Sequence, residues 1–107
     1  MDSERRQQKR VRVEGTATVK MADGSPHIFA PLVDLSTSGC YIETLFPLPV
    51  GTQLQLVIAL KAVDLTVPVT AVVRTADQGV GMGVKFGDEH AQRLREVLEE
   101  LEKKASS

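Results

Sequence analysis

The chain has 107 residues, of which 42% are hydrophobic and 25% charged, with one cysteine and no tryptophan. This length and composition are typical of one globular domain, and they exclude a large multi-part enzyme with a deeply enclosed active site. The formal net charge of -1 argues against a protein that wraps long nucleic acid. Positive charge is nevertheless concentrated at the N-terminus, where residues 1–12 carry five cations and two anions.

The cysteine content and the apolar segments indicate in which cellular compartment the protein is expected. Cys40 is the single cysteine, so no intramolecular disulfide can form and a reducing environment is expected. The first residues contain no apolar stretch typical of a secretory signal, and the longest apolar-rich run, 54–60, is too short to span a bilayer. We therefore expect a cytoplasmic protein without membrane insertion.

The first half of the chain has the alternation of β-strands. From residue 10 onward, Val11, Val13, Ala17 and Val19 fall on one face, which predicts a half-buried strand. Turn-forming residues at 23–26 predict a hairpin that leads to a second strand over 27–34. A third strand is predicted over 40–45, and the proline-containing segment 46–51 ends it.

Three more strands are predicted over 52–60, 65–75 and 80–86, the last two joined by a turn at 77–79. Alternate apolar residues of these strands should face the core: Leu54, Leu56, Ile58 and Leu60, then Leu65, Val67, Val69, Ala71 and Val73, then Val80, Met82, Val84 and Phe86. Pro68 lies on the outward face, which predicts a sheet edge or a bulge at that point.

After residue 86 the apolar period changes to three and four, at Ala91, Leu94, Leu98, Leu101 and Ala105. This period predicts an amphipathic helix over 88–105 with Asp88 as its N-cap. Its apolar face should contact the core, with a dimer seam as the alternative, so we expect a monomer or weak homodimer. Six strands and one helix predict a mainly β fold, either a small antiparallel barrel or a sandwich. Residues 1–9 have no core-facing pattern and are predicted to be a flexible leader to a single domain over 10–107.

The leader contains the first candidate binding residues. Arg6 and Arg10 enclose three residues, and Arg5 precedes them. Guanidinium is a permanent cation with a rigid donor fork, which suits phosphate oxygens and the O6 and N7 acceptors of guanine. The alternative is a solvated basic tail without a ligand.

A second candidate site lies at 34–39, Asp-Leu-Ser-Thr-Ser-Gly. If the strand continues through Ser36, Asp34 and Ser36 share one face while Leu35 is buried opposite. The carboxylate can then accept from the Watson–Crick edge of guanine, and Gly39 permits a positive φ or a close approach of backbone to ligand. The alternative is a turn whose side chains bond only to their own backbone.

Other chemistry is not indicated. His27, His90 and Cys40 are scattered without metal-ligand spacing, so no metal is expected. Ser36 and Ser38 lack the sequence context of a catalytic nucleophile, so we expect no enzyme activity. The glycines at 79, 81 and 83 recur at a period of two, which leaves the outer face of a strand flat for a ligand or another strand.

The two segments together resemble a known family. Arg6-Gln7-Gln8-Lys9-Arg10 resembles the RxxxR motif, and residues 34–39 resemble the [D/N]xSxxG motif, of the PilZ domains of bacterial cyclic di-GMP receptors. The segment 81–86 followed by an amphipathic helix is similar to the end of that domain. The resemblance implies a six-stranded antiparallel barrel with a C-terminal helix. It further implies cyclic di-GMP, a bacterial second messenger, as the ligand, no other cofactor, and an effector protein as partner, in processes such as motility and biofilm formation.

The resemblance also assigns roles to residues. Arg6 and Arg10 would bind phosphate and the Hoogsteen edge of guanine, Asp34 and Ser36 the other edge, and Gly39 would shape the turn. Arg5 would either contact a second, stacked nucleotide or remain solvated, and the leader would become ordered over the ligand. Two alternatives stay open. One is an adaptor of the same fold that binds no nucleotide, and the other is a small RNA-binding barrel, against which the aromatic content of 4% argues.

Overall fold

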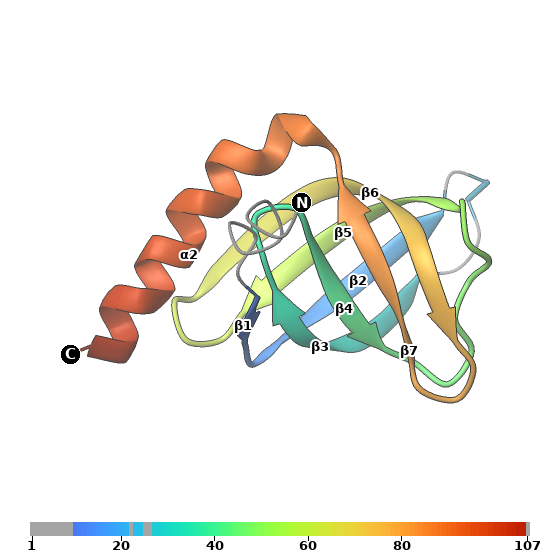
Figure 1. Cartoon of the computed structure of the whole chain (residues 1–107), viewed down its shortest axis with the longest axis horizontal. Coiled ribbons are helices and arrows are strands. Elements are labelled where there is room, and N and C mark those ends of the chain that lie inside the picture. The colour runs from blue at the N-terminus through green and yellow to red at the C-terminus, as the bar shows by residue number, and fades with distance from the viewer. Residues whose placement is uncertain (1–9, 22, 25–26, 107) are drawn as a thin grey trace, which may run out of the picture.

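The strands form an antiparallel barrel, and one helix lies at its end (Figure 1). A computed structural model describes residues 10–21, 23–24 and 27–106. The strands are β1 (Val11–Arg12), β2 (Gly15–Met21), β3 (Ile28–Leu35), β4 (Gly39–Glu43), β5 (Gln53–Leu60), β6 (Leu65–Asp77) and β7 (Gly81–Phe86). A 3-10 helical turn (Asp88–His90) and the helix α2 (Ala91–Ser106) follow.

The sheet closes on itself. Its strand order is β1-β3-β2-β5-β6-β7-β4, and an additional pairing between β3 and β4 joins the two ends. Every one of these pairings is antiparallel. The predicted six-stranded antiparallel barrel with a C-terminal helix is therefore confirmed, with β1 as a short extension beside β3. Closure excludes the sandwich alternative.

The interior of the barrel is filled by alternate residues of the strands, as the period of two predicts. Leu54, Leu56, Ile58 and Leu60 of β5 are all at most 3% exposed. The rest of the strand core consists of Ala17, Val19, Ala30, Leu32, Leu35, Cys40, Ile42, Val67, Val69, Ala71, Val73, Met82, Val84 and Phe86. Burial of this much apolar area is the main force that holds the barrel together.

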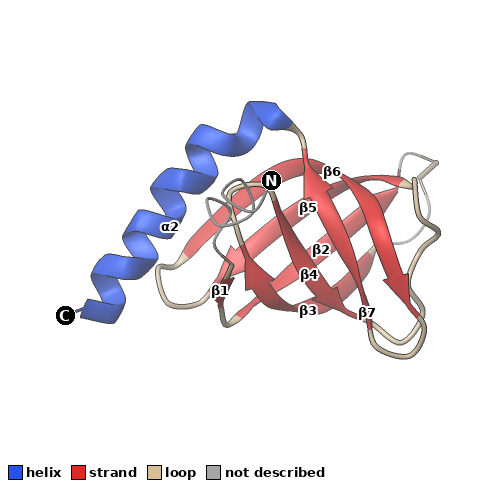
Figure 2. Cartoon of the chain, in the orientation of Figure 1, coloured by secondary structure: helices blue, strands red, loops and turns tan. Residues whose placement is uncertain are grey.

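Helix α2 contributes to the same core at one end of the barrel (Figure 2). Leu94 and Val97 are fully buried, and Leu98 and Leu101 pack partly buried against the cluster. The predicted apolar face was right for Leu94, Leu98 and Leu101 but omitted Val97, which lies about one helical turn after Leu94 on the same stripe. Within the described residues, no helix has the length and apolar character needed to cross a membrane.

The predicted strand from residue 10 onward is interrupted. β1 pairs with the end of β3, and β2 begins at Gly15 after a break. At the break, the Val13 amide donates to Val33 O at 3.3 Å, where the β3–β4 register shifts. A Cβ at Gly15 would lie 2.4 Å from Ala59 O, so glycine lets β2 pass close to β5. These contacts join segments that are distant in the sequence, so the alternation of apolar residues within one strand does not predict them.

Two further predictions fail at the ends of elements. Val80 was assigned to the core but is 57% exposed, because its amide donates to Asp77 O at 2.9 Å and closes a turn before β7. Asp88 was assigned as the N-cap, but Gly87 occupies that position without a side-chain hydrogen bond and Asp88 begins the 3-10 turn. That turn is tied to β6, where the Thr70 amide donates to His90 Nε2 at 3.0 Å.

Pro68 lies opposite Val57 of β5, in a stretch of β6 that pairs with no second strand among the described residues. The pairing of β6 with β7 begins only at Ala71, so the predicted sheet edge is present. The predicted alternative, a bulge, occurs elsewhere in β6, between Val73 and Thr75.

Candidate functional site

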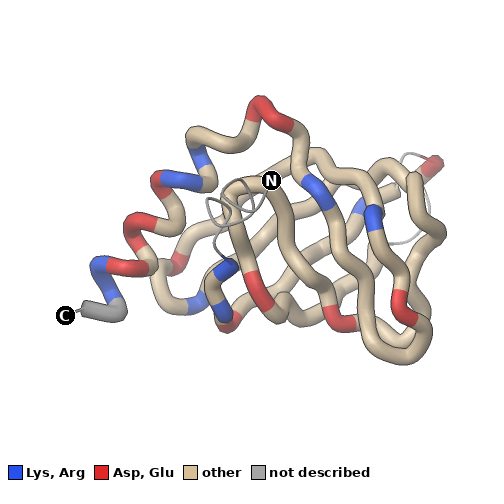
Figure 3. The backbone as a smooth tube through the Cα atoms, in the orientation of Figure 1, with Lys and Arg blue, Asp and Glu red and all other residues tan. Residues whose placement is uncertain are grey.

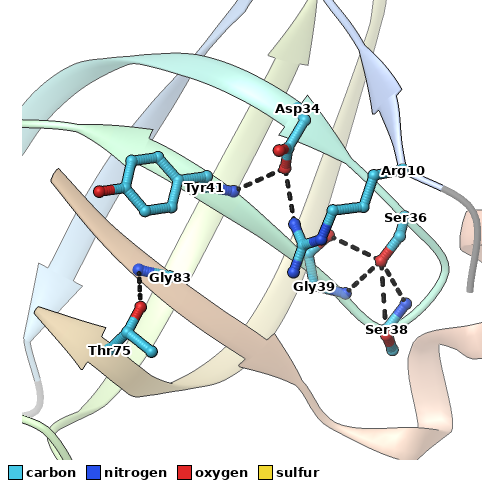
Figure 4. Close-up of polar contacts among 8 residues, drawn as sticks. All are labelled: Arg10, Asp34, Ser36, Ser38, Gly39, Tyr41, Thr75 and Gly83. Carbon is cyan, nitrogen blue, oxygen red and sulfur yellow. Dashed lines mark hydrogen bonds and ion pairs between the residues drawn. The ribbon is translucent and has the colours of Figure 1, made fainter. Parts of the chain in front are cut away.

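The structure brings Arg10 and the segment 34–39 together (Figure 4). In the pairing of β1 with β3, Val11 lies opposite Leu35 and Arg12 opposite Asp34. This register carries Arg10, which directly precedes β1, to the turn that joins β3 to β4. Arg10 Nη1 donates to Asp34 Oδ1 at 2.7 Å. The predicted leader, with Arg5 and Arg6, lies outside the described residues.

Asp34 is held from two sides. Besides the Arg10 guanidinium, the backbone amide of Tyr41 donates to Asp34 Oδ1 at 3.1 Å. The Asp34 side chain remains 21% exposed and that of Arg10 is 52% exposed. The carboxylate is thus fixed in place by β4 while it stays accessible at the surface. It can exchange its guanidinium partner for donors on a ligand.

Ser36 does not share a face with Asp34, contrary to the prediction. β3 ends at Leu35, and the Ser36 side chain turns inward and is 1% exposed. Its Oγ accepts from the amides of Ser38 at 3.2 Å and Gly39 at 3.1 Å, and it donates to Gly39 O at 3.2 Å. The alternation stops here because the chain turns, and the alternative interpretation of a self-bonded turn describes the geometry of Ser36.

Gly39 closes this turn, and its backbone carbonyl accepts from the Ser36 amide at 2.8 Å. Its φ is not positive, in contrast to the φ of Gly24, Gly51 and Gly79. Glycine is required at position 39 because a Cβ would lie 2.2 Å from Val84 O on β7. The close approach that Gly39 permits is therefore that of a neighbouring strand.

A cavity of about 330 Å³ opens beside the turn on the outer wall of the barrel. It is lined by Arg10, Ser38, Gly39, Arg74, Thr75, Gly83, Val84 and Lys85. Arg74 and Lys85 were not among the predicted site residues. Both are charged residues at outward positions of predicted strands, so the alternation alone marks them as exposed. Only the pairing of β6, β7 and β4 places them beside Gly39.

Tyr41 covers the adjacent glycines. A Cβ at Gly81 would lie 2.6 Å from its Cε2 atom, and one at Gly83 would lie 3.7 Å from its Cδ1 atom. The flat face predicted for these glycines is thus occupied by a ring of this chain. Tyr41 Oη donates to Asp77 Oδ2 at 2.7 Å, and this hydrogen bond is the main reason that the pKa of Tyr41 is raised to about 12.

Cys40 lies behind the site in the barrel core. Burial, with a smaller contribution from the negative charge of Asp34, raises the pKa of its thiol to about 12. The thiol is therefore protonated and behaves as a small apolar side chain. In the described part of the chain, no group of three or more His, Cys, Asp or Glu residues is arranged to hold a metal ion.

The comparison with known families decides the identity. The family model of the PilZ domain matches residues 4–103, nearly the whole chain. The chain belongs to the PilZ domain family. No curated protein matches the sequence.

Several solved structures, two of them of PilZ domains, have the same fold. The PilZ domain of YcgR from Escherichia coli with cyclic di-GMP has a TM-score of 0.75 and 19% identity, over 94% of each chain. The PilZ domain of CeSA from a cellulose-synthesizing bacterium has a TM-score of 0.70 and 21% identity, over 88% of this chain and 98% of that chain. The MrkH–cyclic di-GMP complex of K. pneumonia has a TM-score of 0.74 and 18% identity, over 94% of this chain and 53% of MrkH.

Proposed function

We propose that this PilZ domain is a receptor for cyclic di-GMP that signals by contact with a partner protein. The observation that carries the proposal is the contact of Arg10, which also lines a surface cavity, with Asp34 at 2.7 Å. This contact joins the ends of the two sequence motifs, which lie 24 residues apart. Membership of the PilZ family supports the proposal, as do the complexes of YcgR and MrkH with cyclic di-GMP.

The roles of the residues follow from their surroundings. On binding, Arg10 exchanges Asp34 for a phosphate oxygen or the Hoogsteen edge of guanine, and Arg6 acts in the same way. Asp34 then accepts from the N1 and N2 donors of guanine while the Tyr41 amide keeps it in position. Ser36 acts indirectly, because its hydroxyl holds the turn and is too deeply buried to meet a ligand in this conformation.

Binding also orders the leader over the nucleotide in this proposal. Ordering a mobile residue costs about 1–2 kcal/mol, and one charge-assisted hydrogen bond contributes about 1.5–3 kcal/mol. Several arginine contacts are therefore needed together, and the ordered leader presents a new surface to the partner. Amide hydrogen exchange in residues 4–10 should slow when cyclic di-GMP is added. Equal exchange with and without the nucleotide would contradict this part of the proposal.

Isothermal titration calorimetry with cyclic di-GMP tests the binding function, with GTP and cyclic GMP as control ligands. Arg6→Ala and Arg10→Ala should each weaken binding by more than about tenfold, since each removes charge-assisted contacts. Circular dichroism should show an unchanged fold. Arg93→Ala is the matched control, because Arg93 lies on α2 and pairs with Glu96 at 3.8 Å. If Arg6→Ala and Arg10→Ala bind as tightly as the parent, the site is misassigned.

A protein-interaction adaptor without a nucleotide is the second candidate. Exposed apolar side chains favour it, since Phe29 is 71% exposed, Leu45 66% and Val80 57%. These three residues also line one cavity of about 450 Å³. An adaptor of this kind would give no heat with cyclic di-GMP but would retain a protein partner during purification.

A further inference from the structure

We propose that Arg74 and Lys85 form a second anion-binding contact, which takes a phosphate of the ligand held by Arg10 and Asp34. The inference rests on the proposed function and extends its site from the two motifs to the barrel wall. Neither residue belongs to either motif.

Pairing of the strands places both residues beside the motif turn. Lys85 on β7 lies opposite Gly39 on β4 and opposite Val72 on β6. Arg74 is at the register shift of β6 between Val73 and Thr75, where an extra residue bulges from the ladder. Both side chains are exposed, since their buried neighbours Val73 and Val84 face each other in the core.

The two cations lie where two cavities meet. They line the 330 Å³ cavity that also contains Arg10 and Gly39. They also line a cavity of about 480 Å³ that extends over β5 and β6 towards Gly87. Among the residues that the structure describes, none that lines either cavity is acidic. Figure 3 shows the corresponding arrangement along the backbone, with basic positions on β6 and β7 and the acidic position of β6 near its far end.

Charge pairing distinguishes these two cations from Arg10. Arg10 forms an ion pair with Asp34 at 2.7 Å. Within the part of the chain that the structure describes, Arg74 and Lys85 form no ion pair. Two exposed cations on one wall repel each other weakly, and an anion between them removes this repulsion.

The chemistry of the two side chains fits a phosphodiester. The planar fork of Arg74 can donate to two phosphate oxygens at once, and the Lys85 ammonium supplies a point charge. A cyclic dinucleotide carries its negative charge on phosphates and its hydrogen-bonding edges on the bases. We therefore assign part of the phosphate binding to Arg74 and Lys85, in addition to the part that the motif arginines provide.

Calorimetric titration of the full chain with cyclic di-GMP tests this assignment. Arg74→Gln should weaken binding by about tenfold or more, Lys85→Gln by several-fold, and the double variant further. Arg74→Lys keeps the charge but loses the fork, so it should lie between the parent and Arg74→Gln. The matched control is Lys61→Gln, which removes an equal charge from a different cavity, one also lined by Glu14 and Asp64. Raising the salt concentration should weaken the parent more than the double variant.

The outcomes separate the two proposals. If the parent binds, Arg10→Ala binds more than about tenfold more weakly, and Arg74→Gln and Lys85→Gln bind within about twofold of the parent, the second contact is wrong and the proposed function stands. If Lys61→Gln weakens binding as much as Arg74→Gln, the effect is one of net charge and the local contact is again wrong. If the parent gives no heat with cyclic di-GMP, the proposed function falls and this inference with it.

Discussion

Two neighbouring regions of the site differ sharply in their surroundings. The buried turn, residues 36–39, has its Ser36 side chain 1% exposed and bonded to the backbone of Ser38 and Gly39. The exposed rim consists of Arg10, Asp34, Tyr41 and Asp77, joined by an ion pair and by hydrogen bonds at the surface. Asp34 and Ser36, which are two positions apart in the motif 34–39, therefore have different physical roles. The turn builds the fold of the site, and the rim presents groups that a ligand can contact.

The buried turn and the exposed rim should contribute differently to the free energy of unfolding. Loss of a buried hydrogen-bonding group that leaves its partners unsatisfied costs about 1–3 kcal/mol. Loss of one partner of an exposed ion pair costs about 0.2–1 kcal/mol, because water screens the charges. Variants of the turn should therefore reduce stability, whereas variants of the rim should reduce binding and leave stability nearly unchanged.

The largest effect is expected from Gly39→Ala. The new Cβ would lie 2.2 Å from Val84 O, a backbone atom of β7 that cannot move aside without disturbing the barrel. We expect the free energy of unfolding to fall by at least about 2 kcal/mol, measured by urea denaturation.

Gly83→Ala is the control for Gly39→Ala. Its new Cβ would lie 2.7 Å from Thr75 Oγ1, the end of a side chain that can rotate away. A clearly smaller loss of stability is expected for this variant. If Gly83→Ala costs as much as Gly39→Ala, the close approach of β4 and β7 is not the reason for glycine at position 39.

Ser36→Ala should have an intermediate effect on stability. The substitution removes the acceptor of the Ser38 and Gly39 amides in a buried turn. The free energy of unfolding should fall by about 1–3 kcal/mol. Arg10→Ala, measured in the same urea series, should lower the free energy of unfolding by less than about 1 kcal/mol, because the ion pair that it removes is partly exposed to water. If Ser36→Ala and Arg10→Ala lower the free energy of unfolding equally, the proposed difference between the buried turn and the exposed rim is wrong.

The sequence predicts the barrel well because strand alternation is a local signal. Leu54, Leu56, Ile58 and Leu60 were assigned to the core from their spacing alone, and all four are buried. The proximity of Arg10 to Asp34 was also predicted, although through a family resemblance and the order of the motifs rather than from periodicity. For the strand core, neighbours in the sequence carry most of the information.

The remaining features depend on contacts between distant segments. Ser36 turns inward where β3 ends, and Gly39 is fixed by Val84, which lies 45 positions later in the chain. Arg74 and Lys85 join the site only through the pairing of β6 and β7 with β4. The spacing of residues within one strand contains no information on such pairings, so the sequence predicted the motif but not the surface that surrounds it.

The smallest expected effect concerns Tyr41, in the exposed rim. Its hydrogen bond to Asp77 raises the pKa of the phenol from 10.0 to about 12. Because the pKa is raised in the folded state, the hydrogen bond stabilises the fold fully below about pH 10. This stabilisation of the fold is lost as the pH rises towards 12. Because the bond is solvated, Tyr41→Phe should change the free energy of unfolding by less than about 1 kcal/mol.

Tyr41 is the single tyrosine of a chain without tryptophan, so ultraviolet absorbance of the phenolate reports its titration directly. Asp77→Asn removes the negative charge and the strong acceptor, and it should bring the midpoint back towards pH 10. The circular dichroism spectrum recorded at each pH distinguishes titration of the folded chain from unfolding. A parent midpoint near pH 10 with the fold intact would mean that the rim is too mobile in solution to hold this hydrogen bond. The exposed rim would then contribute even less to the free energy of unfolding, relative to the buried turn, than the structure implies.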